Sequence, residues 1–156
     1  MNIIIRRAEV SDLETVQKFG SKLLNFEREK YDSSLDEGWA FSDEAEAKYL
    51  NAIQNRYVSI AEADGRPVGF LIGNIVMPTI KDARQIKQAN LQNIYVDENM
   101  RKTGIGKKLI DEFEKYCRGE GVIRLNVSVL AANKAAIDFY YNNGFKPRSF
   151  NLSREL

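Results

Sequence analysis

Residues 101–106 read Arg-Lys-Thr-Gly-Ile-Gly and have the composition of an anion-binding loop. They lie between a strand-like run, 91–96, and a helical run that begins near residue 105. Two glycines at the start of a helix let a ligand approach unpaired backbone N–H groups, and nearby cations strengthen the attraction for phosphate. The sequence therefore predicts a phosphate-binding loop built from Arg101, Lys102, Thr103, Gly104, Ile105 and Gly106.

Two commoner nucleotide motifs do not fit this loop. A P-loop requires glycine at 101 and serine or threonine at 108, where the chain has Arg101 and Lys108. A dinucleotide fingerprint requires a third glycine where Leu109 stands. A plain tight turn is the simpler interpretation, but the cations Arg101, Lys102, Lys107 and Lys108 surround a helix N-terminus whose dipole disfavours them, which indicates a bound anion.

The remaining pattern, Arg-x-x-Gly-x-Gly with its flanking strand and helix, resembles the pyrophosphate-binding motif of the Gcn5-related N-acetyltransferases, the GNAT family. A second segment also resembles this family: a strand, then Asn133, then Ala136, Tyr140 and the pair Gly144-Phe145. The resemblance covers nearly the whole chain. It implies a single N-acetyltransferase domain over residues 1–156 that uses acetyl-CoA as co-substrate and no metal.

The resemblance also implies roles for individual residues. The backbone of residues 101–106 would bind the pyrophosphate of coenzyme A, and the backbone of Ile94, Tyr95 and Val96 would pair with its pantetheine arm as an added strand does. Asn133 would hydrogen-bond the same arm, although a helix N-cap is a sufficient role for it. Tyr140 would donate a proton to the departing thiolate, although packing is the ordinary role of a tyrosine on a helical stripe.

The general base is left open by the sequence. Many relatives place a glutamate on the strand before the loop, where this chain has Gln92 and Asn93. Glu27, Glu29 and Asp97 are the alternatives, and each is also explained as a solvated surface charge.

The acceptor is predicted to be a cationic amine. Residues 25–46 contain eight acidic and two basic side chains, and a negative rim attracts polyamines, aminoglycosides, and lysine-bearing or N-terminal peptide segments. A polar loop and a dipole-matched helix start are the alternative explanation for these acids. Tyr31 and Trp39 either line an amine pocket through cation–π contacts or pin the loop to the core. The candidate substrate-binding residues are Glu27, Glu29, Tyr31 and Trp39.

Composition restricts the remaining possibilities. The chain has a net charge of +1, no histidine and one cysteine, so we expect no zinc site, no Ser-His or Cys-His nucleophile, and no general attraction to nucleic acid or membrane. Cys117 follows an apolar helical stripe and is interpreted as a core thiol. The chain shows neither a membrane span nor a secretory signal, which predicts a cytoplasmic protein. Its oligomeric state is left open, a homodimer included.

Hydrophobic periodicity predicts a mixed α/β (α+β) fold with a central sheet of six to seven strands, splayed middle strands and about four helices. Helices are expected over 11–25, from Ser42, over 105–117 and over 133–142, with Ser11–Glu14 as a capping box. Strands are expected over 2–7, 57–63, 67–76, 91–96 and 123–129, with one or two more in 145–156. Residues 25–41 are expected to form a loop, and 77–90 an extended hairpin or a mobile functional loop.

The predicted activity is direct acetyl transfer from acetyl-CoA to a primary amine, without a covalent enzyme intermediate. The alternative is a non-catalytic acyl-CoA-binding sensor or interaction module. A nucleic-acid-binding domain is disfavoured, because the cations do not form a stripe with exposed aromatic residues.

Overall fold

The computed structural model describes residues 1–77 and 85–156. The main elements, in chain order, are β1 (Ile3–Arg7), α1 (Leu13–Lys30), α2 (Asp43–Asn55), β2 (Tyr57–Ala63), β3 (Arg66–Val76), β4 (Gln88–Val96), α3 (Ile105–Gly119), β5 (Arg124–Val127) and α4 (Lys134–Asn142). Short 3-10 segments lie at Val10–Asp12, Trp39–Phe41 and Glu98–Met100. No helix within the described ranges has the length and apolar character needed to cross a membrane.

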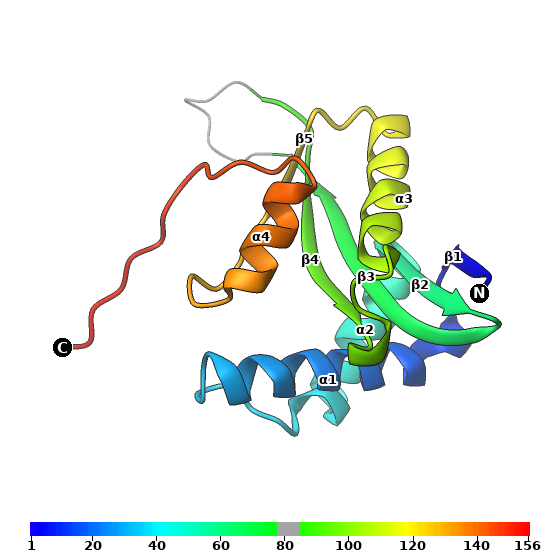
Figure 1. The fold of residues 1–156 in the computed structure, drawn as a ribbon, viewed down its shortest axis with the longest axis horizontal. Helices are drawn as coiled ribbons and strands as arrows, with labels where there is room; N and C mark the ends of the chain where they lie inside the picture. The colour runs from blue at the N-terminus through cyan, green and yellow to red at the C-terminus, as the bar shows by residue number, and fades with distance from the viewer. Residues whose placement is uncertain (78–84) are drawn as a thin grey trace.

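The strands form one open sheet in the order β1-β2-β3-β4-β5 (Figure 1). Neighbouring strands are antiparallel except β4 and β5, which are parallel and are joined by the crossover through α3. The predicted mixed α/β sheet with four α-helices is therefore confirmed for the described part of the chain.

The helices cover both faces of this sheet because the central strands are apolar on both sides. In β2, Tyr57 and Ala61 belong to the core cluster under α3 and α4, while Val58 and Ile60 belong to the cluster under α1 and α2. This alternation follows from the two-residue period of a strand. It places α1 on one side of β4 and the α3–α4 pair on the other.

The middle of the sheet diverges at β4. Strand β3 pairs with β4 as far as Val96, but β5 pairs with β4 only over residues 88–91. Residues 92–96 therefore have one edge without a strand partner among the described residues. This divergence corresponds to the predicted splay, and it opens beside residues 101–106.

The prediction of six to seven strands was wrong, since the sheet of the described residues has five. The expected closing strands in 145–156 are absent, because residues 146–156 are exposed and run away from the sheet without a strand partner (Figure 1). An extended segment becomes a strand only when its backbone pairs with a neighbour.

The N-terminal half of the chain corrects two further predictions. Helix α1 continues to Lys30, past the predicted end at residue 25, through the helix-favouring run Glu-Arg-Glu-Lys. The capping carboxylate before it is Asp12, which accepts the Glu9 N–H at 2.8 Å, and Ser11 does not serve as the cap. Asp12 is held there by two hydrogen bonds of 2.8 Å from Arg6, which lower the pKa of its carboxyl.

Two hairpins meet the expectations differently. Asp64 and Gly65 both have positive φ, 49° and 77°, as the predicted tight turn requires. In the second hairpin Val76 pairs with Gln88, so β4 begins three residues before the predicted residue 91. Most of the predicted connection 77–90, namely 78–84, lies outside the described residues.

Candidate active site

Residues 101–106 form a loop whose backbone N–H groups point to no protein acceptor. No hydrogen bond to another described residue is formed by the N–H groups of residues 102–107. Lys102 and Gly104 have positive φ values of 63° and 86°, which turn the chain sharply before α3. Ile105 is buried directly after the turn and anchors it. The result is a row of free donors at a helix N-terminus, which is an anion-binding arrangement.

Gly106 keeps this row of donors close to α4. A Cβ atom added at Gly106 would lie 3.0 Å from Cζ of Phe139, which is tighter than ordinary packing. Phe139 belongs to α4, immediately before Tyr140. The second glycine of the motif therefore lets α3 begin against α4, so the free donors and Tyr140 lie on neighbouring helices.

The cations around the loop are more strongly paired than the sequence suggested. Lys107 contacts Asp111 at 2.7 Å, and Arg101 lies 3.9 Å from Glu98. The Arg101 Nε also donates to the Val96 carbonyl at 3.1 Å. Lys102 and Lys108 are exposed and form no ion pair among the described residues. The attraction for an anion therefore comes mainly from the backbone and the helix dipole, with Lys102 and Lys108 as free charges.

The end of β4 presents backbone to the space beside the loop. Tyr95 is buried on the α1 side against Phe19, with ring centroids 5.9 Å apart, while Ile94 and Val96 pack against the α3–α4 cluster. Their side chains are structural, and the free edge over residues 92–96 is what remains for recognition. The Val96 carbonyl is already occupied by Arg101.

Tyr140 has a buried ring and a hydroxyl without a protein partner. Only 8% of the residue is exposed, and its ring lies edge-on to Phe139 and Phe145 at 5.4 Å from each. The hydroxyl forms no hydrogen bond within the described residues and is not among the fully buried polar atoms. Burial, and to a smaller extent the negative charge of Glu27, raises the pKa of Tyr140 to about 12. The phenol is therefore a protonated donor at neutral pH.

Glu27 is the carboxylate that lies near Tyr140. It is only partly exposed, its side chain forms no ion pair or hydrogen bond with another described residue, and burial raises its pKa above the ordinary value. The other two candidate bases differ from it. Asp97 is paired with Lys22 at 2.7 Å, and Glu29 is exposed. Of the three, only Glu27 has its pKa raised by burial and also lies near enough to Tyr140 for its charge to raise the pKa of the phenol.

Tyr31 and Asn133 meet across the site. The Tyr31 hydroxyl donates to Oδ1 of Asn133 at 3.3 Å, which joins the end of α1 to the start of α4. The same oxygen accepts the Ala136 N–H at 3.0 Å, so Asn133 is the N-cap of α4. Glu27 lies one helical turn before Tyr31, and its carbonyl accepts the Tyr31 N–H at 2.8 Å. These contacts place Glu27, Tyr31 and Asn133 on the α1–α4 side of the site.

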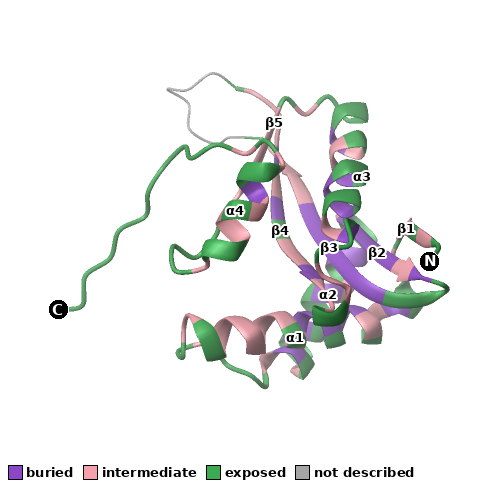
Figure 2. Cartoon of the chain, viewed as in Figure 1, coloured by how far each residue is buried: buried purple, intermediate pink, exposed green. Residues whose placement is uncertain are grey.

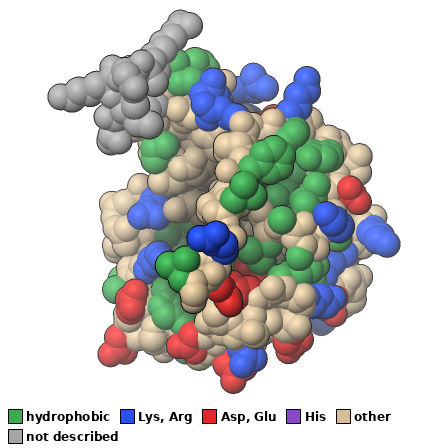
Figure 3. All heavy atoms as spheres, turned by 90° about the vertical axis from the view of Figure 1, so that its left-hand side faces the viewer, with side chains coloured by type: hydrophobic (Ala, Val, Ile, Leu, Met, Phe, Trp, Pro, Cys, Tyr) green, Lys and Arg blue, Asp and Glu red, His purple; other side chains and the backbone are tan. Residues whose placement is uncertain are grey.

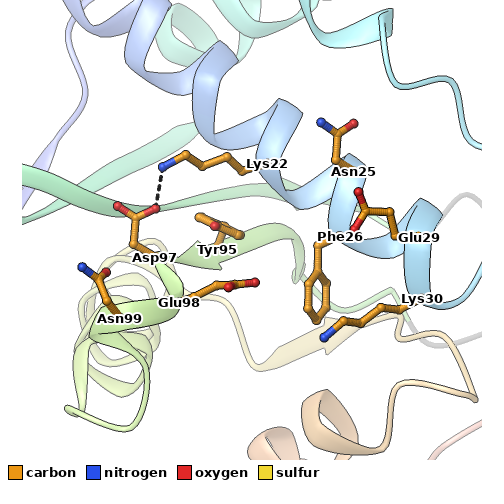
Figure 4. Close-up of a pocket in the computed structure, with 9 residues that line it drawn as sticks. All are labelled: Lys22, Asn25, Phe26, Glu29, Lys30, Tyr95, Asp97, Glu98 and Asn99. Atoms are coloured by element: carbon orange, nitrogen blue, oxygen red, sulfur yellow. Dashed lines mark hydrogen bonds and ion pairs between the residues drawn. The ribbon is translucent and has the colours of Figure 1, made fainter.

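A cavity of about 550 Å³ separates α1 from the end of β4 (Figure 4). It is lined from α1 by Lys22, Asn25, Phe26, Glu29 and Lys30, and from the opposite wall by Tyr95, Asp97, Glu98 and Asn99, so three acids and two lysines border it. The Asn25 side-chain oxygen is buried without a hydrogen-bond partner in the described structure. In Figure 3 the acidic side chains visible on this side of the molecule lie mostly along its lower part, at the height of α1.

Several of the acids on which the prediction of a cationic acceptor rested form hydrogen bonds or ion pairs with nearby residues. Asp32 accepts hydrogen bonds from Ser34, Asp36 accepts the Gly38 N–H, and Glu37 pairs with Arg28 at 3.1 Å. Glu27 and Glu29, which lie on α1 and not in the predicted loop, remain beside the site. Trp39 packs edge-on against Tyr49 at 6.0 Å, in the core cluster under α1 and α2. No ring or hydrogen-bond contact joins it to Tyr31 or Tyr140 within the described residues.

Asn25 and Phe26 were not among the residues predicted for the site. Both fall where the helical period was expected to end, and they become visible only because α1 continues over them. The Arg101 guanidinium lies 4.8 Å from the centre of the Phe26 ring, so Phe26 connects α1 to the anion-binding loop. No group of acidic, cysteine or histidine side chains in the described residues has the arrangement of a metal site.

The model of the acetyltransferase (GNAT) family matches residues 17–145. A spermidine N(1)-acetyltransferase from Thermoplasma acidophilum is 27% identical over 153 residues, which cover 94% of this chain and 89% of that protein.

Two solved structures have the same fold. The BH1408 protein from Bacillus halodurans, as a tetramutant, superposes with a TM-score of 0.89 at 19% identity, covering 98% of this chain and 99% of that one. An aminoglycoside N-acetyltransferase, AAC(6')-Iy, in complex with CoA superposes with a TM-score of 0.76 at 18% identity, covering 99% and 95%.

Proposed function

Because this chain belongs to the acetyltransferase (GNAT) family, and is thus an acetyl-CoA-dependent N-acetyltransferase, we propose that it acetylates a small polycationic amine of the polyamine class by direct transfer. The observation that carries the cofactor half of this proposal is the row of unpartnered N–H groups over residues 102–107, which adjoins the free edge of β4. A diphosphate needs such donors, and an amide-bearing arm needs such an edge.

The residues present fit coenzyme A in both respects. Residues 102–107 would hold its pyrophosphate, with Lys102 adding charge, and the edge over Ile94, Tyr95 and Val96 would pair with its pantetheine amides. Asn133 has a side-chain amide directed between α1 and α4 and would contact the same arm. When bound, acetyl-CoA supplies an acetyl thioester, and an N–H group of the β4 edge would polarise its carbonyl.

Two residues of the chain would carry out the proton transfers of the reaction. An acceptor amine must lose a proton before its lone pair can form the C–N bond, and Glu27 would take it, directly or through a water molecule. As the C–S bond breaks, sulfur leaves with the electron pair, and Tyr140 would donate its phenolic proton to that thiolate. The second proton that the nitrogen loses on becoming an amide would restore the Tyr140 phenol. The products are free coenzyme A, the N-acetylated amine and one proton released to solvent.

The acceptor class is supported by the α1 side of the site. Glu27 and Glu29, at the C-terminal end of α1, would attract a cation. The cavity of about 550 Å³ has room for a small amine chain. The Thermoplasma acidophilum relative, named for spermidine, is consistent with this class.

The test is a thiol-release assay with acetyl-CoA across spermidine, spermine, an aminoglycoside, a lysine-bearing peptide and a neutral amine, with mass spectrometry of each product. We expect amine-dependent release of coenzyme A and the highest kcat/KM for a polyamine. A peptide as the best acceptor would overturn the acceptor class and leave the reaction intact. Tight binding of acetyl-CoA without turnover on any amine would instead support a non-catalytic acyl-CoA-binding module. The alternative is retained because residues 92 and 93 are Gln and Asn, where many relatives carry a glutamate.

A further inference from the structure

The second half of α1 lies beyond the buried core. The buried residues of this helix all fall between Val16 and Gly20, whereas residues 21–30 are half-buried or exposed (Figure 2). Within the described residues, Phe26 packs against neither of the two core clusters. Glu27, the proposed base, follows Phe26 directly. Its position therefore depends on the few contacts that hold this half of the helix, and not on the core.

One of these contacts comes from Arg101 in the cofactor loop, residues 101–106. The Arg101 Nε donates to the Val96 carbonyl at 3.1 Å, which holds the side chain against the end of β4. Its guanidinium carbon lies 4.8 Å from the centre of the Phe26 ring and 5.5 Å from the centre of the Tyr95 ring. A guanidinium within about 6 Å of the centre of an aromatic ring is attracted to it. Arg101 therefore joins β4 to α1 through Phe26.

The contacts of Arg101 distinguish it from the residues that follow it in the loop. Its backbone N–H donates to the Glu98 carbonyl at 3.3 Å, whereas the N–H groups of residues 102–107 have no acceptor among the described residues. Its guanidinium faces two aromatic rings and lies 3.9 Å from the Glu98 carboxylate. Lys102, in contrast, is exposed and forms no ion pair within the described part of the chain. The donors suited to a diphosphate therefore begin after Arg101, whose side chain is directed to the protein.

A series of contacts continues from Phe26 to α4. The Phe26 ring lies edge-on to Tyr31, with ring centroids 5.9 Å apart, and the Tyr31 hydroxyl donates to Oδ1 of Asn133 at 3.3 Å. Glu27 lies between these two aromatic residues in the sequence. The contact at Phe26 thus holds the part of α1 that carries both Glu27 and Tyr31.

We propose that Arg101 is a positioning residue for the amine half of the site and takes no part in binding the diphosphate. Its guanidinium holds Phe26, and with it Glu27 and Tyr31, at the position relative to the cofactor loop that acetyl transfer requires. This inference rests on the proposed function, because it takes the acceptor amine and its base to lie on the α1 side.

The test compares Arg101→Gln, Phe26→Leu and their double variant. Lys102→Gln is the matched control, because it removes the neighbouring charge of the same loop. Steady-state kinetics at saturating acetyl-CoA give KM for the best amine, and calorimetric titration gives the dissociation constant of CoA. We expect each single variant to raise the amine KM by about 5- to 30-fold and to leave CoA binding nearly unchanged. The double variant should be no worse than the more affected single variant, because both changes remove the same contact.

Lys102→Gln should have the opposite effect, with weaker CoA binding and an unchanged amine KM. Hydrogen exchange of residues 24–31 in the free enzyme tests the contact without turnover. Exchange there should be faster in Arg101→Gln and Phe26→Leu than in the wild type and Lys102→Gln.

Three results overturn the proposal. Weaker CoA binding in Arg101→Gln with an unchanged amine KM would mean that Arg101 binds the diphosphate. Additive effects in the double variant would mean that Arg101 and Phe26 act separately, and unchanged exchange of residues 24–31 would mean that Arg101 does not hold α1. If the wild type turns over no amine, the proposed function fails, and the exchange measurement alone decides the role of Arg101.

Discussion

Tyr140→Phe removes one oxygen atom from the proposed proton donor and leaves the rest of the site in place. The ring stays between Phe139 and Phe145, with which it makes edge-on contacts at 5.4 Å. We expect kcat to fall by about 10²- to 10⁴-fold, the usual range for loss of a general acid, while the dissociation constant for acetyl-CoA stays nearly unchanged. Steady-state kinetics and calorimetric titration measure the two quantities.

The stability of this variant can be worked out from the same geometry. The hydroxyl has no hydrogen-bond partner in the described structure, so its removal at neutral pH should be neutral or slightly stabilising. In alkali the sign is definite: an exposed phenol in the unfolded chain loses its proton near pH 10, whereas the buried one keeps it until about 12. Wild-type stability therefore falls above pH 10, relative to the Phe variant, by about 1.4 kcal/mol at pH 11.

Tyr141→Phe is the matched control, because Tyr141 is adjacent but 52% exposed and lies outside the core. It should change neither kcat nor the alkaline stability. The reasoning is refuted if Tyr140→Phe retains wild-type turnover at all pH values. In that case the residue contributes packing alone, and the thiolate obtains its proton from solvent.

The remaining variants separate the base, the loop and the acceptor charge. Glu27→Gln should lower kcat by about 10²- to 10⁴-fold at neutral pH, and kcat should recover as the pH approaches the pKa of the amine. In the wild type, the acid limb of the pH–rate profile should lie above the ordinary pKa of a glutamate, because burial raises the pKa of Glu27. Gly104→Ala should cost about 1–2 kcal/mol of stability, measured by urea unfolding, and weaken CoA binding in titration, because φ is +86° while no atom lies within 4 Å of the added Cβ. The control is Gly119→Ala at the end of α3, where an added Cβ also meets no atom within 4 Å; it should neither lower stability nor weaken CoA binding. Glu29→Lys should raise KM for a polyamine, leave KM for acetyl-CoA unchanged and reduce the dependence of amine kinetics on salt.

The sequence predicted the position of the backbone turn before α3 and the N-cap of α4. The glycines at 104 and 106 and the flanking periods located the loop, because positive φ and close helix packing restrict the residue types at those positions. Asn133 was recognisable as a helix cap for a similar reason, and it accepts the expected N–H of Ala136. Constraints of this kind act within a short segment, so they can be predicted from sequence without knowledge of tertiary contacts.

The parts that were missed depend on long-range contacts. The pairing of Lys107 with Asp111 reduced the free charge at the loop, and the sequence alone did not tell a free lysine from a paired one. The separation of Glu27 from Asp97 as candidate bases required the ion pair to Lys22, which is 75 residues away along the chain. The one or two closing strands predicted in 145–156 were wrong, because an extended segment becomes a strand only when its backbone pairs with a neighbour, and the structure shows none for it.

Hydrogen–deuterium exchange with and without coenzyme A tests the central claim most directly, since the claim concerns N–H groups that lack acceptors. Residues 102–107 form no hydrogen bond within the described protein, so they should exchange fast in the free enzyme and slow markedly when CoA binds, together with the open edge over 92–96. Peptides from β1, which is already paired with β2, should be unaffected. If CoA binds and protects neither 102–107 nor 92–96, the cofactor lies elsewhere on the fold, and the assignment of Tyr140 and Glu27 to the chemistry is contradicted with it.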